Sequence, residues 1–319
     1  MKIAVLDDYA DVARNLADWS GLGDVTVFHN TLSDREELAA RLSPFDVVCL
    51  MRERTLLTAD LIRALPRLRL IVTSGPRNAA IDLVAAADCG VTVCGTQSRK
   101  TTTSELAVLL MLALNRRLLP EVASLSAGGW QTGLGRDLAG LTLGLVGLGT
   151  IGAQMAAFGH AFGMDVAAWS TNLTDARCAE LGVTRAPTLH GLMATSDIVS
   201  VHLVLSDRTR GLINAAAFAA MKPEAVFINT SRAAIHDTPA LLAGLHAGRP
   251  AMAGLDVFDD EPLSPADPLH DAELRASGRL LLTPHLGYTT EATFRLFYTQ
   301  TAEAIRAYAA GTPIRQLFP

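Results

Sequence analysis

The sequence predicts an α/β protein with two doubly wound parallel-sheet domains joined by crossover helices. Short apolar runs recur along the chain, helical patterns lie between them, and this alternation occurs in two series separated by a long apolar helix. Strands that alternate with helices indicate a parallel sheet covered on both faces. A length of 319 residues also favours two domains, at ~150 residues each.

The first series occupies the first hundred residues. Its predicted strands are KIAVLD, VTVF, FDVVCL, LRLIVT and VTVCGT, with helical patterns such as SDREELAARL and TADLIRAL between them. A long apolar helix is then predicted over 101–119, because a Thr/Ser cluster with Glu105 is typical of a helix start. The Gly-rich stretch that follows, up to residue 140, has no periodicity and is interpreted as an arm.

The second series begins at Leu141 with the predicted strands LTLGLVG, DVAAWS, DIVSVHL, AVFINT, AMAGLDVF and RLLLTP. The tail 290–310 reads as one amphipathic helix closed by Gly311, and we expect it to return to the first domain. The predicted domains are therefore 1–100 with 290–319, and 101–289.

Composition excludes several classes of protein. The net charge of −5 argues against nucleic acid as a partner, and the longest apolar run, Leu106 to Leu114, is far below the ~20 residues of a membrane span. Asp7 and Asp8 follow the first residues too soon for a signal peptide. The four cysteines form no C-x-x-C pair, so we expect reduced thiols in a soluble, cytoplasmic protein. The histidines lack the spacing of metal ligands, so we expect no metal site.

A glycine loop opens the second series. LTLGLVGLGTIGAQMAAF contains G-x-G-x-x-G as Gly147, Gly149 and Gly152, between a strand and a helical stretch. There the three glycines permit a tight turn, a close approach of backbone to pyrophosphate, and close packing of helix on strand. The helix N-terminus adds N–H groups for phosphate. We predict dinucleotide binding; the alternatives are a structural turn or another nucleotide-like ligand.

The next strand bears on the choice of dinucleotide. NAD-binding folds usually place Asp or Glu about 20 residues further on, to bind the ribose 2′-hydroxyl. Here Ser170 holds that position, followed by Thr171 and Asn172, with no adjacent arginine. Nothing repels a 2′-phosphate and nothing obvious attracts one, so NAD and NADP both stay open.

Three polar residues follow strands of the second series. Arg232 comes after AVFINT, Glu261 after AMAGLDVF, and His285 after LLLTP. In open α/β sheets ligands lie beyond the carboxyl ends of the strands. Arginine offers a fork to a carboxylate, histidine exchanges a proton near neutral pH, and glutamate can hold the second imidazole nitrogen. Behind a dinucleotide loop, the three together indicate catalysis.

At these residues the sequence resembles the D-isomer-specific 2-hydroxyacid dehydrogenases, which include phosphoglycerate and glyoxylate/hydroxypyruvate reductases. The matching stretches are GLVGLGTIG, DIVSVHLVLSDRTRGLIN, FINTSRAAIHDTPALLAGL, AGLDVFDDEPL and TPHLGY, in the family's order. The resemblance implies a Rossmann cofactor domain, a flavodoxin-like substrate domain, a homodimer, and hydride transfer between NAD or NADP and a small 2-keto or 2-hydroxy acid. No nucleic acid or membrane partner is expected.

The resemblance also implies roles. Arg232 would bind the substrate's carboxylate and keto oxygen, His285 would exchange the proton, and Glu261 would orient His285 and raise its pKa. The cofactor would contact Gly147, Gly149, Thr150, Ile151, Gly152, Ser170, Leu203, Thr230, Ser231, Arg232, Asp256 (on the carboxamide), His285 and Gly287, which would leave room beside it.

Substrate binding involves the first domain as well. The resemblance implies that Ser74 and Gly75, in IVTSGPRNAAID, present backbone N–H groups to the substrate carboxylate. Pro76-Arg77 departs from the small residues of many members, which leaves the substrate open. Arg52 or Arg54, in MRERT after a strand, could read an acidic substrate tail.

Two alternatives remain at this point. One is a glyoxylate/hydroxypyruvate reductase that uses NADPH, which the absence of an acid at Ser170 permits. The other is a dinucleotide-sensing, corepressor-like binding protein, which could retain all three strand-end residues without turnover.

Overall fold

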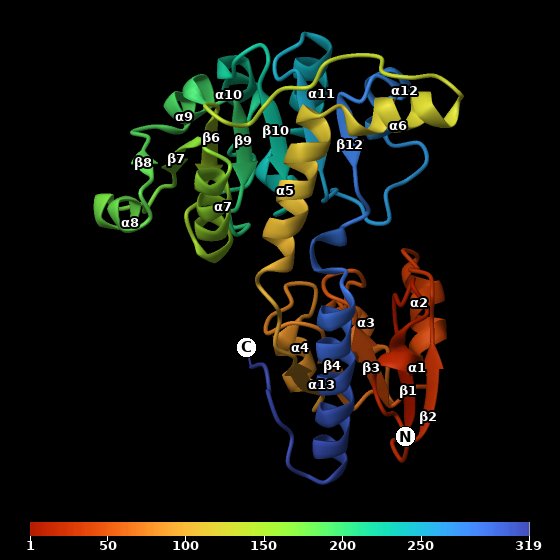
Figure 1. Cartoon of the computed structure of the whole chain (residues 1–319). Coiled ribbons are helices and arrows are strands. Elements are labelled where there is room, and N and C mark those ends of the chain that lie inside the picture. Colours follow the sequence, from red (N-terminus) through yellow and green to blue (C-terminus); the bar gives the residue numbers. More distant parts are fainter. Residues whose placement is uncertain (319) are drawn as a thin grey trace. The chain divides into compact units, whose positions relative to one another are not determined.

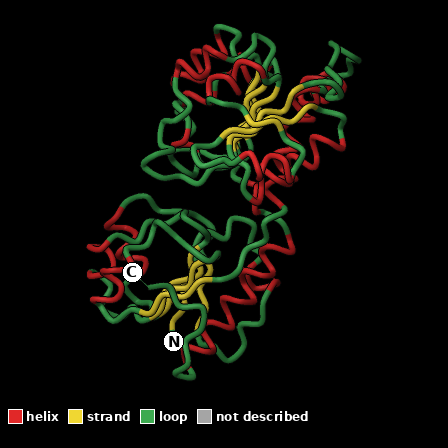
Figure 2. The backbone as a smooth tube through the Cα atoms, turned by 90° about the vertical axis from the view of Figure 1, so that its left-hand side faces the viewer, coloured by secondary structure: helices red, strands yellow, loops and turns green. Residues whose placement is uncertain are grey.

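The computed structural model describes residues 1–318 and divides into two compact units, Met1–Arg99 with the segment from Thr289 onward, and Lys100–Tyr288. Each unit has a sheet in its middle with helices on both sides (Figure 2). The two doubly wound parallel sheets confirm the predicted fold class. None of the described helices is long and apolar enough to cross a membrane.

The first unit is built on five parallel strands in the order β2-β1-β3-β4-β5 (Figure 1). The strands are short, with four residues each; β3 and β4 are buried along their whole length, as expected of a sheet covered on both faces. Their bounds are β1 Lys2–Val5, β2 Asp24–Val27, β3 Val47–Leu50, β4 Leu70–Thr73 and β5 Thr92–Gly95. The helices are α1 Ala13–Leu16, α2 Arg35–Leu42, α3 Ala59–Arg63, α4 Leu83–Asp88 and α13 Glu291–Ala309.

Helix α13 belongs to this first unit, as the sequence predicted for the tail. Its buried side chains recur on one face, including Phe294, Phe297, Tyr298 and Ile305, and this face packs on α1, β4 and β5. The Thr290 side chain accepts a hydrogen bond from the Thr293 N–H and so caps its start.

The second unit has seven parallel strands in the order β12-β11-β10-β9-β6-β7-β8. The order reverses between β9 and β6, which is where open α/β sheets bind ligands. The strands are β6 Thr142–Val146, β7 Asp165–Trp169, β8 Thr184–Arg185, β9 Ile198–Val201, β10 Val226–Asn229, β11 Met252–Leu255 and β12 Leu280–Leu282. All but β8, whose two residues give no periodic signal, were predicted.

The helices of this unit cover both faces of its sheet. They are α5 Thr102–Asn115, α6 Leu118–Ser126, α7 Thr150–Ala161, α8 Asp175–Glu180, α9 Leu189–Thr195, α10 Ala215–Ala220, α11 Thr238–His246 and α12 Ala272–Ala276, with 3₁₀ turns η1 Ala233–Ile235, η2 Pro268–His270 and η3 Leu286–Tyr288. Helix α5 packs on α7, β10, β11 and η3.

The helix predicted over 101–119 is in fact two helices. Arg117 has a left-handed φ of 54°, which ends α5, and α6 then extends to Ser126, into the stretch expected to be an arm. The Asn115 side chain accepts two hydrogen bonds from the Arg136 guanidinium, and its carbonyl accepts one from the Arg136 N–H. This tertiary contact lies at the break. Three polar residues, 115–117, stand there, but apolar residues resume at Leu118, so the sequence pattern was interpreted as one helix.

Candidate active site

The centre of the candidate site is a histidine–carboxylate pair beyond β11 and β12. Nδ1 of His285 lies 2.7 Å from Glu261 Oε2 and 2.9 Å from Oε1, and Glu261 Oε1 also accepts from the Phe258 N–H. Both side chains are largely buried, with 19% of His285 and 17% of Glu261 exposed. A carboxylate on Nδ1 requires the proton there, so Nε2 is the nitrogen that can exchange a proton with a substrate.

The turn that carries His285 is held by Asp256. His285 has a left-handed φ of 53°, which is uncommon for a residue with a side chain. The Asp256 carboxylate accepts from the Thr283 hydroxyl (2.7 Å) and from the N–H groups of Leu286 (2.6 Å) and Gly287 (2.9 Å). Burial raises the pKa of Asp256, and these three hydrogen bonds and the nearby His285 act in the opposite direction.

Two residues expected at the cofactor also have structural roles here. The contact of Asp256 with the nicotinamide carboxamide stays a prediction; Asp256 is fully buried and its oxygens hold the His285 turn. Gly287 was expected to leave room for a cofactor. A Cβ at Gly287 would instead lie 3.1 Å from Asp256 Oδ2 and 3.5 Å from Thr103 Cγ2, so protein atoms fill that space.

Arg232 lies in a tight turn after β10. Asn229, the last residue of β10, accepts from the Ser231 N–H (2.9 Å) with Oδ1 and donates to the Arg232 carbonyl (2.9 Å) with Nδ2. The Ser231 hydroxyl donates to the Val201 carbonyl at the end of β9, and Arg232 Nη1 donates to the Ser231 carbonyl. Because β10, β11 and β12 are adjacent and parallel, Arg232, Glu261 and His285 follow three neighbouring strand ends at one edge of the sheet.

The glycine turn lies at the same edge, between β6 and α7. Gly147 has a φ of 107°, and a Cβ there would lie 2.7 Å from the His202 carbonyl oxygen and 3.0 Å from Leu203 Cδ2. A Cβ at Gly152 would lie 2.1 Å from the Gly147 carbonyl oxygen, whereas nothing in the described chain lies within 4 Å of a Cβ at Gly149. The steric reasons predicted for the three glycines are therefore met, with Gly149 on the open side.

Helix α7 begins directly at this turn, with Thr150 and Ile151 as its first residues. Among the described residues, no side chain caps its N-terminus. The first-turn N–H groups and the positive end of the helix dipole thus remain available for an anion. Thr230, after β10, is buried and its hydroxyl has no hydrogen-bond partner in the part of the chain described. The open glycine, the uncapped helix and this hydroxyl fit a bound dinucleotide.

Ser170 directly follows β7 and is half-buried. Of the basic residues further along, Arg177 pairs with Glu180 (2.7 Å) and Arg185 with Asp175 (3.1 Å). Because each of these arginines pairs with a carboxylate, the residues that follow β7 carry no excess positive charge that would attract a 2′-phosphate. The structure thus retains the ambiguity between NAD and NADP that the sequence left.

In the first unit, Arg52 is fixed at the end of β3. It has a φ of 54°; its N–H donates to the Ser74 hydroxyl (2.7 Å), its carbonyl accepts from Asn78 (2.6 Å), and its Nη1 donates to the Ser74 carbonyl (3.1 Å). A Cβ at Gly75 would lie 1.9 Å from Arg52 Nη1, so the guanidinium packs against that glycine.

The expected role of the Ser74 and Gly75 N–H groups is wrong. The Ser74 N–H donates to the Leu50 carbonyl (3.0 Å) and the Gly75 N–H to the Thr96 hydroxyl (2.7 Å), so neither is presented to a ligand. Pro76, which follows, has no N–H. Sequence pattern alone could not reveal this, because the competing acceptors come from β3 and from the residue after β5.

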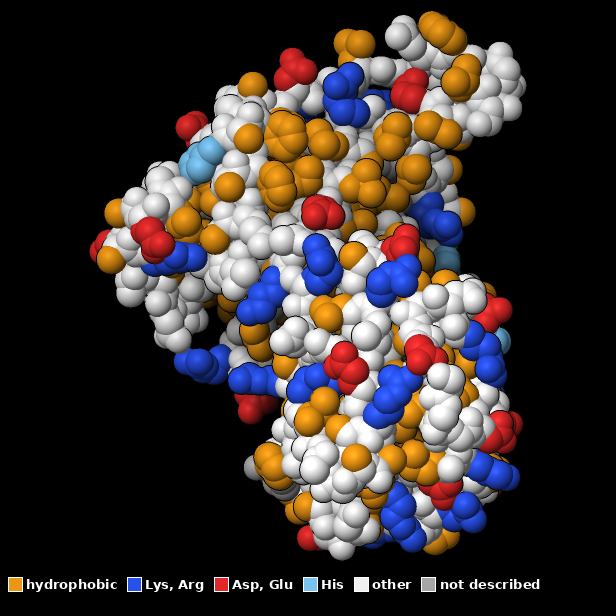
Figure 3. Space-filling model, turned by 60° about the horizontal axis from the view of Figure 1, so that its bottom comes forward, with side chains coloured by type: hydrophobic (Ala, Val, Ile, Leu, Met, Phe, Trp, Pro, Cys, Tyr) orange, Lys and Arg blue, Asp and Glu red, His pale blue; other side chains and the backbone are white. Residues whose placement is uncertain are grey.

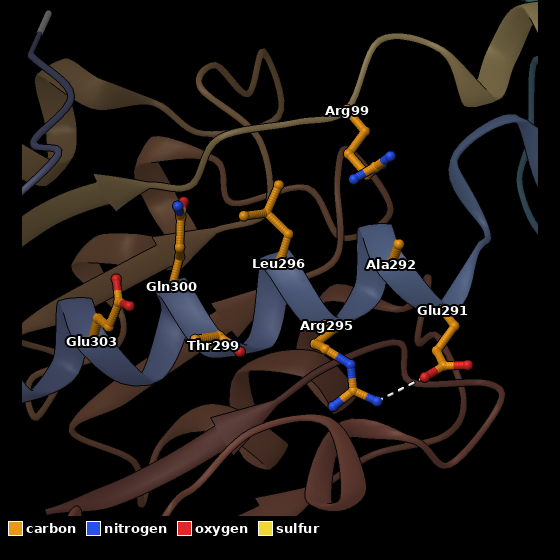
Figure 4. A pocket seen from close by; sticks show the side chains of 8 residues that line it. All are labelled: Arg99, Glu291, Ala292, Arg295, Leu296, Thr299, Gln300 and Glu303. Atoms are coloured by element: carbon orange, nitrogen blue, oxygen red, sulfur yellow. Dashed lines mark hydrogen bonds and ion pairs between the residues drawn. The ribbon is translucent and has the colours of Figure 1, made fainter.

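Two other features lie apart from these residues. A hollow of about 570 Å³ lies between Arg99 and α13 (Figure 4), where Arg295 turns aside to pair with Glu291 at 2.7 Å. Its charges are mixed, and it contains none of the predicted site residues. Asp8, Asp11 and His29 place potential metal ligands near one another, but Asp8 already caps the segment before α1 and the other two are exposed.

The glycine turn lies where the strand order reverses, and Arg232, Glu261 and His285 follow strands at the same edge of the sheet. This arrangement is typical of the active site of a dinucleotide-dependent enzyme. The family model described as "D-isomer specific 2-hydroxyacid dehydrogenase, NAD binding domain" matches residues 108–287. The chain belongs to the D-isomer specific 2-hydroxyacid dehydrogenase family.

Individual relatives agree. A glyoxylate reductase of Aeropyrum pernix is 37% identical over 271 residues, 81% of this chain and 79% of the relative. A D-3-phosphoglycerate dehydrogenase of Mycobacterium leprae is 34% identical over 281 residues, 87% of this chain and 52% of the relative; the chain spans about half the length of such relatives. The crystal structure of a phosphoglycerate oxidoreductase from Vibrio cholerae superposes with a TM-score of 0.91, at 37% identity, over 98% of this chain and 99% of that one.

Sequence reasoning missed Asn229 and His236, and it missed that Asp256 holds the His285 turn. Asparagine is favoured where a side chain closes a turn, so Asn229 at the end of a predicted strand carried a usable signal. His236, in the run AAIHD, carried none, because its partner is fixed only by folding.

The buried histidine His202 gives a pH test. Both its ring nitrogens are buried without a hydrogen-bond partner among the described residues, and burial lowers the pKa to about 3. The unfolded chain binds a proton there below about pH 6.5 and the folded chain does not, so falling pH destabilises the fold by about 1.4 kcal/mol per pH unit. We expect His202→Leu to lower the slope by about that amount in urea unfolding of the ligand-free protein between pH 6 and 4.5, while His236, whose pKa burial also lowers, keeps its own contribution.

His190→Leu is the matched control, because His190 is exposed. An unchanged slope in the His202 variant, or an equal change in both variants, would contradict this assignment.

Proposed function

We propose that this protein is an oxidoreductase that transfers a hydride between NAD(P)H and a small 2-keto acid, giving a D-2-hydroxy acid. The observation that carries the proposal is the His285–Glu261 hydrogen bond at the sheet edge that also holds the Arg232 turn and the glycine loop. Relatives named as phosphoglycerate dehydrogenase and glyoxylate reductase support it.

A bound nicotinamide dinucleotide supplies the hydride. The glycine turn and the start of α7 would hold its pyrophosphate, Leu203 would lie near the adenine, and Thr230 would lie beside the nicotinamide. Arg232 binds the substrate carboxylate with its planar fork and keeps the keto carbon in position. His285 gives its Nε2 proton to the keto oxygen as that oxygen becomes a hydroxyl, and Glu261 stabilises the charged imidazole before transfer.

Two alternatives are weighed against this proposal. The binding-protein alternative is not favoured, because the relatives reported above are named as enzymes. Reduction of glyoxylate or hydroxypyruvate with NADPH remains the narrower candidate, supported by Ser170 and by the glyoxylate reductase relative. Arg52, with its guanidinium fixed against Gly75, is proposed to read an acidic group of the substrate.

A homodimer in the cytoplasm is part of the proposal. Large apolar side chains are exposed close together on α5, α6 and the arm, with Leu125 61%, Trp130 73% and Leu134 95% exposed. Figure 3 shows hydrophobic side chains gathered on one face of the Lys100–Tyr288 unit. Such clustering is typical of an interface. Four free cysteines support a reducing compartment.

The first test is His285→Ala. Loss of the proton donor should lower kcat by about 10²–10⁴, while NADH still binds, as followed by its fluorescence. The wild type is first screened against a panel of 2-keto acids with NADH and NADPH in parallel. His246→Ala, at an exposed surface histidine, is the control. Near-normal turnover of the His285 variant would refute the assignment, and tight NADH binding without turnover of any acid by the wild type would favour the binding protein.

The second test concerns cofactor choice. Ser170→Asp should weaken NADPH binding by about tenfold or more relative to NADH, because the new carboxylate repels a 2′-phosphate and can accept from a 2′-hydroxyl. Ser170→Asn, which adds similar bulk without charge, is the control, and dissociation constants come from fluorescence titration. Equal effects of both variants on both cofactors would place the adenosine ribose elsewhere.

The third test concerns assembly. Leu125→Glu combined with Leu134→Glu should convert a dimer to a monomer in sedimentation velocity, because two charges cannot be desolvated in an apolar interface without partners. Val84→Glu, at an exposed apolar residue on α4 (59% exposed), should leave the dimer intact. A wild type that sediments as a monomer, or dissociation in the Val84 variant alone, would contradict this surface.

A further inference from the structure

We propose that His236 is a positioning residue for Arg232: it accepts a hydrogen bond from Asn229 and thereby locks the turn that carries the guanidinium. This inference rests on the proposed function of Arg232. His236 lies outside the set of Arg232, Glu261 and His285, and no sequence pattern around it predicted a role in the site.

The first step is the orientation of the Asn229 amide. The Ser231 N–H can only donate, so the Asn229 atom 2.9 Å from it must be the oxygen. Nδ2 is therefore the atom that faces both the Arg232 carbonyl, at 2.9 Å, and His236 Nδ1, at 3.0 Å. One hydrogen of Nδ2 is donated to the Arg232 carbonyl and the other to His236 Nδ1. His236 therefore accepts the second N–H of the Asn229 amide, which closes the Arg232 turn.

The second step is the state of the imidazole. His236 follows η1 and is only 4% exposed. Its ring packs at right angles to Phe218 (89° between the ring planes) and is tilted against Phe227 (59°), with centroids 6.4 and 5.5 Å away. Burial lowers the pKa of His236 to about 4, so the ring is neutral at pH 7. Since Nδ1 accepts, the proton lies on Nε2.

The third step is the far side of the ring. His236 Nε2 faces the Thr238 hydroxyl at 3.5 Å, and that hydroxyl faces Asp259 Oδ2 at 3.4 Å. Both distances are at the outer limit for a hydrogen bond, so they add little energy. The ring is therefore held mainly by Asn229 and by the two phenylalanines.

The consequence concerns substrate binding. Without an acceptor at position 236, a buried Asn229 N–H is left without a partner, which favours rotation of the amide and release of the Arg232 carbonyl. The Arg232 guanidinium is then no longer held in one direction by the turn. The glycine turn, between β6 and α7, does not include these contacts, whereas Thr230 and Ser231 belong to the disturbed turn. We therefore expect the loss of NADH affinity to be much smaller than the change in KM.

The experiment compares two substitutions. His236→Phe keeps an aromatic ring between Phe218 and Phe227 but removes the acceptor. His236→Asn keeps an acceptor, because its Oδ1 is separated from Cα by the same number of bonds as histidine Nδ1. We expect His236→Phe to raise the KM of the best 2-keto acid about tenfold with a much smaller change in NADH affinity, and His236→Asn to restore most of the loss in KM.

A matched control separates positioning from general destabilisation. Ser196→Ala removes another buried hydrogen bond, from Ser196 to the Leu192 carbonyl before β9, at the opposite edge of the sheet. It should lower Tm without changing KM. Equal KM changes in the Ser196 and His236 variants, or a loss of NADH affinity as large as the change in KM, would overturn the inference.

A second readout does not depend on turnover. In ¹⁵N-histidine NMR at pH 7, the signals that His236→Asn removes should show an unprotonated Nδ1 and a protonated Nε2. A charged ring, or a proton on Nδ1, would overturn the inference whatever the activity. If the wild type reduces no 2-keto acid, the proposed function fails, and this measurement still decides whether His236 accepts from Asn229.

Discussion

The candidate site depends on the hydrogen bond between His285 Nδ1 and Glu261, in a turn that Asp256 holds. His285 occupies a left-handed backbone conformation, which costs roughly 1–2 kcal/mol for a residue with a side chain. Three donors on the Asp256 carboxylate, each worth about 1.5–3 kcal/mol at a charged acceptor, offset that strain. The backbone of this turn thus sets the direction of the His285 side chain, and Glu261 fixes the ring through Nδ1.

A similar arrangement of one side chain holding a turn occurs at the end of β10. Asn229 closes the Arg232 turn much as Asp256 closes the His285 turn, with one buried polar side chain satisfying several backbone groups. Both scaffolding residues are fully buried at strand ends, so they are as rigid as the sheet itself. Placing reactive groups on such ends, rather than on long loops, fixes their directions before a substrate arrives.

The elements of the fold were predictable because their signals are local. Apolar runs such as LRLIVT and AVFINT became β4 and β10, and the tail became α13 within a residue or two. The break at Arg117 was missed, because apolar residues resume directly after Asn115–Arg117 and the contact of Asn115 with Arg136 forms only on folding. Similarly, the N–H groups of Ser74 and Gly75 looked available from the sequence, but donate to acceptors from other strands.

By itself the sequence determined the two parallel sheets, the glycine turn and the placing of Arg232, Glu261 and His285 after successive strands, since parallel strands all end at one edge. Only the tertiary structure decided that Nδ1 of His285 faces Glu261, that Asp256 serves the turn, and that His236 meets Asn229. These last facts depend on side-chain directions and on partners far apart along the chain. Periodicity and spacing carry no information about them, because a hydrogen bond is set by a few tenths of an ångström that only packing fixes.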